Sequence, residues 1–491
     1  MTMLRQHRPE DAVSLLTPLV KSQPNDYKAL TLIGMALSAS GNSEDAVRTL
    51  ERALQVRPQY PPALRALASS ELASKNYEAA KTHFEQVLNL APSDPVANAG
   101  LGDVAFIQSN FPAAVRYFER SGSLYRNDPR LLIEYAKASI ESAQPAKAIE
   151  ALASLPETAD GSIHFDAGSL LASLRRYDDA SRQFELALPE YPDRYSAGFN
   201  LVLARVKAKN YREAIAAGQK LIANGYVKAE LYNLLAEAYE KAGETKQAYD
   251  SLRTATQLEP LDETNYVDLI TLCTEHTNYD LAAEIANIGL AKLPLSERLH
   301  LQYGVVLAMK AQLEQARKEF QLAAQLSPKR SLPYVALALV SMQMNKPDDA
   351  VEQLHKRVRE FPDDYLALWF LGEAVNRGGV VPGSPADREA TRALRHSVQL
   401  NPDISQSQEL LGKFLARDGQ LDEAAGHLER AIVLDPANVG AIYQLAQVYS
   451  RKGNASRAKE LFAKVSRMKA EDRENFTKRG LQQILRADPK M

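Results

Sequence analysis

The sequence predicts an all-α protein built from stacked helix–turn–helix repeats, and two regularities of spacing carry this prediction. Small residues recur 34 positions apart, at Ala12, Ala46, Ala80, Ala114 and Ala148. Prolines recur at the same spacing, at Pro24, Pro58 and Pro92 and later at Pro260, Pro294, Pro328 and Pro362. A fixed period of this length is typical of solenoid proteins, in which each repeat packs only against its neighbours.

The repeats begin with an incomplete one and continue nearly to the end of the chain. Residues 1–26 are expected to hold a second helix only, and thirteen whole repeats are expected over residues 27–472. Their starts are Tyr27, Pro61, Pro95, Pro129, Gly161, Tyr195, Ala229, Glu263, Glu297, Ser331, Tyr365, Ser405 and Val439. Residues 473–491 are predicted to form a C-terminal capping helix and tail. Because terminal repeats normally carry a polar cap, we expect the natural gene product to begin upstream of Met1.

Each repeat is expected to consist of two helices. In the repeat that begins at Ala229, apolar residues recur at helical spacing in two runs, Leu231, Leu234, Leu235 and Ala238, then Ala248, Leu252 and Ala255. The turn Ala242-Gly243-Glu244 separates the runs, and Pro260 ends the repeat because proline cannot continue a helix. Small residues at the eighth and twentieth positions of most repeats are expected to let the two helices approach closely.

The repeat that begins at Tyr365 is six residues too long. The extra residues lie near 378–386, where glycines and prolines predict an irregular loop. Ser384 and Pro385 then suit the N-cap and the first position of the second helix. The loop is either a binding insertion or a tolerated surface insertion.

The pattern resembles the tetratricopeptide repeat family, whose 34-residue unit is a helix–turn–helix. The family's Leu-Gly pair corresponds to Ile33-Gly34, Leu101-Gly102, Leu371-Gly372 and Leu411-Gly412. Its later alanine and phenylalanine correspond to Ala80 and Phe84, Ala114 and Phe118, Ala180 and Phe184, Ala316 and Phe320, and Ala458 and Phe462. The resemblance covers roughly residues 3–472 and implies a right-handed superhelical solenoid whose first helices line a concave face.

Motifs of catalysis and cofactor binding are missing from the sequence. The eight histidines lie one per repeat or fewer without metal-ligand spacing, and the nucleotide-binding and nucleophile motifs are absent. Cys273 falls at a helix-packing position and is interpreted as a core residue. We therefore expect no enzyme activity and no cofactor.

The net charge of −2 disfavours nucleic acid as the main partner. No apolar run of the sequence reaches the ~18 residues that span a bilayer.

Large apolar residues occupy first-helix positions that the resemblance implies are exposed in the groove. They are Phe165, Phe199, Leu203, Leu301, Val305, Leu332, Val335, Leu339, Met342 and Trp369. Such a run at solvent-facing positions marks an interaction surface, which suits an amphipathic helix or an apolar extended segment. The same pattern would also arise from a tighter superhelix that covers these residues, from a register that is one residue off, or from variation within the family.

Basic residues gather in the last three repeats. Arg377, Arg417 and Arg451 share the thirteenth position of their repeats, and Lys413 lies at the ninth. They form either a row that grips a carboxylate or phosphate through forked hydrogen bonds, or a solvated basic edge at helix C-termini. The family's carboxylate clamp for C-terminal peptides requires Lys at the fifth and Asn at the ninth position of one repeat, a pair that no repeat of this sequence has.

These observations predict a non-catalytic scaffold that binds a peptide or amphipathic helix of a protein partner in its concave groove. Two alternatives remain, a substrate-recruiting or regulatory arm of a larger enzyme of the O-linked glycosyltransferase type, and a periplasmic or outer-membrane scaffold for export. The compartment stays open, since the sequence as it stands fits the cytoplasm and an upstream signal peptide would place it in the periplasm. The oligomeric state is not predicted.

Overall fold

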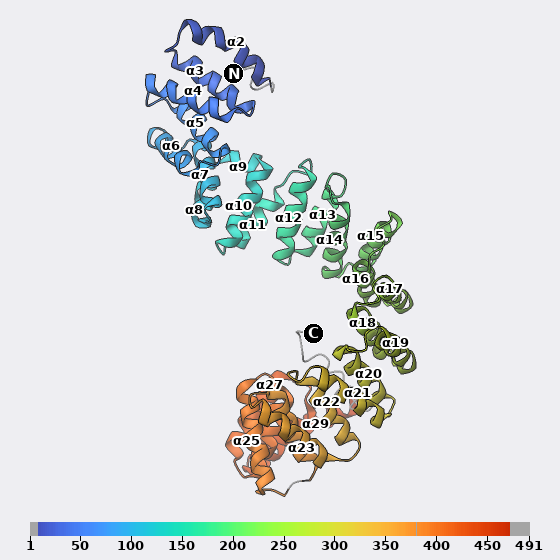
Figure 1. Ribbon diagram of the computed structural model, residues 1–491. Coiled ribbons are helices and arrows are strands. Elements are labelled where there is room, and N and C mark those ends of the chain that lie inside the picture. The colour runs from blue at the N-terminus through green and yellow to red at the C-terminus, as the bar shows by residue number, and fades with distance from the viewer. Residues whose placement is uncertain (1–7, 380, 472–491) are drawn as a thin grey trace. The chain divides into compact units, whose positions relative to one another are not determined.

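The chain folds into α-helices throughout the residues that this computed structural model describes, which are 8–379 and 381–471. Within those ranges there are twenty-eight helices and no strand. Consecutive helices pack side by side as antiparallel pairs (Figure 1). The predicted all-α architecture of helix–turn–helix repeats is therefore confirmed. The capping helix predicted at 473–491 lies outside the described residues.

The first helix of each repeat begins at the expected repeat start or one residue from it. The first helices are α3 (Tyr27–Ala39), α5 (Pro61–Ala73), α7 (Pro95–Ile107), α10 (Pro129–Glu141), α12 (Gly161–Ser173), α14 (Arg194–Lys207), α16 (Ala229–Lys241), α18 (Glu263–Glu275), α20 (Glu297–Met309), α22 (Leu332–Gln343), α24 (Tyr365–Arg377), α26 (Ser405–Arg417) and α28 (Val439–Arg451). The prolines and aspartates at these starts fix the first turn or accept from its free backbone N–H groups.

The second helices follow after short turns. They are α2 (Pro9–Ser22), α4 (Ser43–Val56), α6 (Tyr77–Leu90), α8 (Phe111–Arg120) with its continuation α9 (Ser123–Asn127), α11 (Pro145–Ala153), α13 (Tyr177–Ala187), α15 (Tyr211–Ala223), α17 (Thr245–Leu258), α19 (Tyr279–Lys292), α21 (Leu313–Leu326), α23 (Pro347–Glu360), α25 (Pro385–Leu400), α27 (Leu421–Leu434) and α29 (Ala455–Glu471). Helix α2 packs against α3 as the second helix of the incomplete first repeat.

The chain divides into two compact parts. The N-terminal half comprises Met1–Val227 and Leu234–Thr245, and the C-terminal half comprises Lys228–Asn233 and Lys246–Met491. Each half has its own clusters of buried apolar side chains, which link consecutive helices. Each half is therefore a stack of helix pairs held together by its own core.

In most repeats the two helices meet where a small residue of the first helix lies against a large residue of the second. Gly34 faces Leu50 and Gly304 faces Phe320, and a Cβ atom on either glycine would lie 2.4 Å from the partner side chain. Leu50 is 0% and Phe320 1% exposed. The large side chains are packed on all sides, so the glycines set the distance between the helices.

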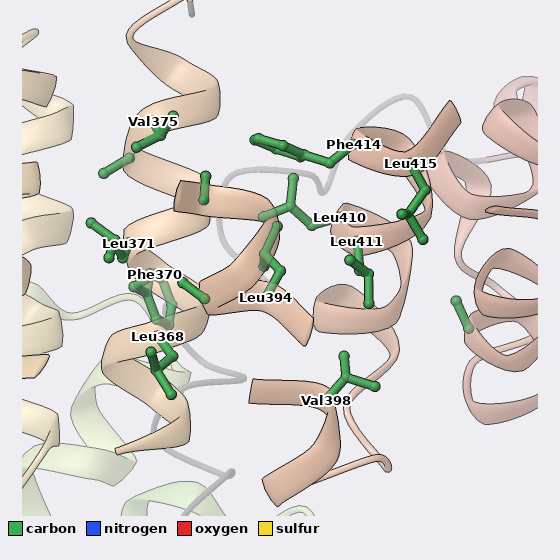
Figure 2. Close-up of a cluster of buried hydrophobic side chains, with 14 of the residues drawn as sticks. Leu368, Phe370, Leu371, Val375, Leu394, Val398, Leu410, Leu411, Phe414 and Leu415 are labelled. Atoms are coloured by element: carbon green, nitrogen blue, oxygen red, sulfur yellow. The ribbon is translucent and has the colours of Figure 1, made fainter. Parts of the chain in front are cut away.

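The core of the C-terminal half runs without interruption across three helices (Figure 2). Leu368 and Leu371 of α24, Leu394 of α25, and Leu411 and Phe414 of α26 are each exposed by 3% or less. Burying one such side chain contributes about 1.5–3 kcal/mol. Because α25 follows the inserted loop and still supplies its core residues, the insertion leaves the packing of the repeat intact.

The turn between the two helices of a repeat has one backbone conformation throughout. Its central residue, at the fifteenth position, has a φ angle between 56° and 83° in all thirteen repeats. Glycine holds this position in five repeats, and Lys, Ser, Ala, Arg, Thr or Asn in the other eight. The left-handed conformation costs a non-glycine residue about 1–2 kcal/mol, so the packing of the helix pair imposes the turn even where the residue disfavours it.

A single methyl group at Gly304 tests the contact between paired helices. In Gly304→Ala the new Cβ collides with the buried ring of Phe320, so we expect the free energy of unfolding to fall by about 1–3 kcal/mol. Gly426 on α27 has no atom within 4 Å of an added Cβ, and Gly426→Ala is expected to raise the free energy of unfolding by up to about 1 kcal/mol. Urea unfolding followed by circular dichroism measures both changes, and shifts of the same sign would contradict the packing argument.

Candidate partner-binding site

Five of the predicted groove residues are core residues instead. Leu301 and Val305 of α20 are 2% and 4% exposed, and Leu332, Val335 and Met342 of α22 are 4%, 0% and 7% exposed. Helix α20 packs against α22, and α22 against α24, and these contacts cover the side chains. The expectation that they face an open groove is therefore wrong, because their side chains are packed into the cores of the C-terminal half.

The three predicted groove residues that belong to the N-terminal half are partly exposed. They are Phe165 of α12 and Phe199 and Leu203 of α14. The ring of Phe165 stacks on that of Tyr191 with centroids 4.1 Å apart, and the ring of Phe199 lies 5.8 Å from that of Tyr195. Repeat spacing does not reveal Tyr191, because it lies in the turn between two repeats.

In the C-terminal half two partly exposed apolar residues lie on neighbouring first helices. Leu339 of α22 and Trp369 of α24 pack against the same buried cluster, and α22 contacts α24. The indole ring of Trp369 lies 4.5 Å from the ring of Phe370, which is buried. These two residues, called the apolar patch below, combine a fixed position with exposed surface.

Elsewhere the first helices carry ion pairs instead of apolar side chains. Arg130 of α10 forms ion pairs with Glu134 of the same helix, at 2.6 Å, and with Asp103 of α7, at 3.3 Å. Burial raises the pKa of Glu134 to about 7, and the charge of Asp103 adds to the rise, whereas Arg130 opposes it. Lys137 pairs with Asp166 of α12 at 3.2 Å. This part of the surface already satisfies its own charges.

Three of the four predicted basic residues line one cavity of the C-terminal half. Lys413 and Arg417 of α26 and Arg451 of α28 border a cavity of about 380 Å³, called the basic pocket below. Its other lining residues are Ala416, Gln444, Gln447, Val448, Ser450 and Phe462. Arg377 of α24 is not among them and forms an ion pair with Glu373 at 2.8 Å. The structure thus brings together Lys413, Arg417 and Arg451 but not Arg377.

The two arginines of the basic pocket are held in place by neighbouring groups. The guanidinium of Arg417 lies 3.9 Å from the ring centroid of Phe414, and its Nη2 lies 3.6 Å from a carboxylate oxygen of Asp387. Arg451 donates a hydrogen bond from Nη1 to the backbone oxygen of Ala416. Repeat spacing does not predict the role of Asp387, since this residue follows the inserted loop.

Other reactive side chains occupy structural positions. Cys273 is buried, and burial raises the pKa of its thiol to about 11. The ring of His300 hydrogen-bonds Glu319 and the backbone oxygen of Pro294. Among the described residues no three His, Cys, Asp or Glu side chains gather to bind a metal. In the same part of the chain no helix has the length and apolar character needed to cross a bilayer.

Comparison with known families matches most of the chain to one of them. Two family models, both described as tetratricopeptide repeat, match residues 3–70 and 415–476, and residues 65–129, 165–225, 199–263, 335–384 and 386–439.

Among curated proteins, Type IV pilus assembly protein PilF of Pseudomonas aeruginosa is 31% identical over 132 residues, which are 26% of this chain and 52% of that protein. Tetratricopeptide repeat protein 21A of Homo sapiens is 22% identical over 170 residues, which are 35% of this chain and 13% of that protein. The chain thus matches about half the length of the first and a small part of the second.

Among solved structures, yeast Tom70 is similar with a TM-score of 0.42 at 17% identity, covering 88% of this chain and 95% of that one. A chain of the APC/C hetero-tetramer Cut9-Hcn1 is similar with a TM-score of 0.39 at 15% identity, covering 87% and 96%. The helices of this chain and the contacts between them establish its fold without these two structures.

The carboxyl of Glu134 predicts a pH dependence of stability in the N-terminal half. Its folded-state pKa of about 7 lies above the ordinary 4.5, so its contribution to stability is complete at acidic pH and is lost as the pH rises through about 7. Between pH 5 and pH 8 we expect the free energy of unfolding of the wild type to fall by on the order of 2 kcal/mol more than that of Glu134→Gln. Urea unfolding at the two pH values measures this difference.

Asp103→Asn serves as the second variant in this measurement. It removes the neighbouring charge but leaves Glu134 buried, so we expect part of the pH dependence to remain, since burial is the larger cause. Identical pH dependence in wild type and Glu134→Gln would show that this carboxyl does not titrate in the expected range.

Proposed function

Because this chain belongs to the tetratricopeptide repeat family, we propose that it is a non-catalytic scaffold that binds a protein partner along its first helices. The family match extends over most of the chain. Helical repeats account for the described residues between 9 and 471. Both findings support a role in binding, which solenoid proteins perform on the surface that successive repeats share.

The observation that carries this proposal is the set of partly exposed apolar side chains on first helices. Leu339 and Trp369 rest on the core of the C-terminal half, and Phe165 rests on Tyr191 in the N-terminal half. Aromatic side chains held in this way bury large areas on binding and lose little conformational freedom. On the first helices α7 and α10, by contrast, Arg130 forms ion pairs with Asp103 and Glu134, and these charged side chains offer no apolar surface to a partner.

The partner that fits the apolar patch is an amphipathic helix or an extended apolar segment. Neighbouring helices pack about 8–10 Å apart. Side chains on one face of a helix, or alternate side chains of an extended segment, reach across that distance. Truncating a central aromatic residue in such an interface costs about 2 kcal/mol or more, so Trp369 is the residue on which we expect binding to depend most.

We propose, as a second function, a role in the assembly of a bacterial surface structure. The observation that favours it is the 31% identity over 132 residues with Type IV pilus assembly protein PilF. The match spans 52% of that protein, so the proposal concerns the process and names no component. Deletion of the gene is expected to reduce the number of surface pili counted by electron microscopy, and unchanged numbers would contradict it.

Removing the apolar patch tests the scaffold function. In the double variant Leu339→Ala and Trp369→Ala, we expect the captured partner to fall by at least about tenfold in affinity purification from a native lysate, because the contact area on α22 and α24 is lost. Mass spectrometry identifies the partner. Trp369 is the only tryptophan of the chain, so fluorescence of the wild type titrated with the purified partner reports contact directly through a shift to shorter wavelength.

The matched control carries Leu261→Ala and Leu295→Ala. These leucines are 73% and 79% exposed in turns between repeats, so their removal deletes more exposed apolar surface at another place. Circular dichroism first establishes that both double variants are folded. The scaffold proposal fails if no protein is enriched by the wild type, or if both double variants retain the partner equally.

A further inference from the structure

Two of the three cationic side chains that line the basic pocket of the C-terminal half form no ion pair with any residue that the structure describes. Among the described residues, neither Lys413 nor Arg451 forms an ion pair. By contrast, Arg377 pairs with Glu373 at 2.8 Å, and Lys452, which follows Arg451, pairs with Asp422. Unpaired cations that share one cavity with neutral donors form a site for an anion.

We propose that the basic pocket binds a carboxylate group of an acidic peptide. This inference rests on the proposed function, since it assigns one chemical feature to the peptide that the scaffold binds. Lys413 and Arg451 supply the positive charge, and Gln444 and Gln447 supply neutral hydrogen-bond donors on the neighbouring helix α28. Ala416, Val448 and Phe462 form the apolar part of the lining, and they suit the aliphatic stem of a glutamate or aspartate.

The arginines of the pocket are positioned before any ligand arrives. Arg417 is stacked on Phe414 and faces Asp387, and Arg451 is anchored to the backbone of Ala416. Nη2 and Nε of Arg417 are buried and form no hydrogen bond within the described ranges. They make up the edge of the guanidinium that faces Asp387. A site whose donors are already ordered loses less conformational entropy on binding.

The charge balance favours a carboxylate over a phosphate dianion. Asp387 offsets the charge of Arg417, which leaves Lys413 and Arg451 as the uncompensated cations. Glu409, one turn before Lys413, interacts electrostatically with it and reduces the positive potential further. A single negative charge therefore matches the remaining cations better than the ~−2 charge of a phosphate group.

Helix dipoles alone do not account for this arrangement. Arg417 and Arg451 lie in the last turns of α26 and α28, where the helix dipole favours cations. Lys413 lies one turn earlier, outside that effect, and still borders the same cavity. Arg377 occupies the same last-turn position of α24 and has a carboxylate partner of its own. The cavity and the unpaired cations are thus the features that point to a ligand.

Binding of a fluorescein-labelled hexaglutamate peptide to the full chain tests the proposal, with the matched hexaglutamine peptide as reference. Fluorescence anisotropy in about 50 mM salt keeps electrostatic attraction measurable. We expect wild type to prefer hexaglutamate, and Lys413→Gln with Arg451→Gln to weaken its binding by at least about tenfold. Arg377→Gln with Lys452→Gln removes the same charge from residues that do not line the pocket, and we expect a change within about twofold.

Three results would overturn the proposal. They are equal binding of the two peptides to wild type, equal weakening in the two double variants, and displacement of the peptide by inorganic phosphate at lower concentrations than by glutarate. Failure of the pocket is distinguishable from failure of the scaffold function. The variant Leu339→Ala and Trp369→Ala retains the basic pocket and is expected to bind hexaglutamate like wild type, whatever it captures from a lysate.

Discussion

The contact between a small residue of the first helix and a large residue of the second is the constraint on which the rest of the structure depends. At Gly34 and Gly304 a single added carbon would collide with Leu50 and Phe320. The contact brings the two backbones close together, and a left-handed turn joins the two helices in all thirteen repeats. Most repeats are built in this way, and the exposed surface of each half then depends on how successive helix pairs overlap.

The overlap between repeats is also what the sequence could not predict. The 34-residue period located the helices, since proline, glycine and N-cap residues act within a few positions of the chain. The exposure of Leu301 or Val335 depends instead on the rotation from one repeat to the next, which a period does not contain. Both residues belong to clusters of buried side chains that link successive helices. Leu339 and Trp369 lie on the same helices, but on the side that the overlap leaves partly open.

For the basic residues, by contrast, the sequence predicts most of the observed arrangement. Arg417 and Arg451 share a pocket because equal positions in consecutive repeats stack in space, which spacing alone predicts, and Lys413, one turn before Arg417, borders the same pocket. Arg377 instead pairs with Glu373 of its own helix, and Arg417 faces Asp387 on the helix that follows the six-residue insertion. The contact with Asp387 does not follow from the repeat spacing, because Asp387 comes directly after the insertion, and only the packed structure shows it.

The apolar patch and the basic pocket lie on four successive first helices of one half, α22, α24, α26 and α28, each in contact with the next. Three steps of about 8–10 Å separate the first helix from the last. About eight extended residues, or about eighteen helical ones, cover that distance. A partner segment that is apolar at one end and acidic at the other would contact both sites at once, and the second contact would form at the high effective concentration that the first creates. If both proposals hold, such a segment would bind more tightly than a peptide that contacts the apolar patch or the basic pocket alone.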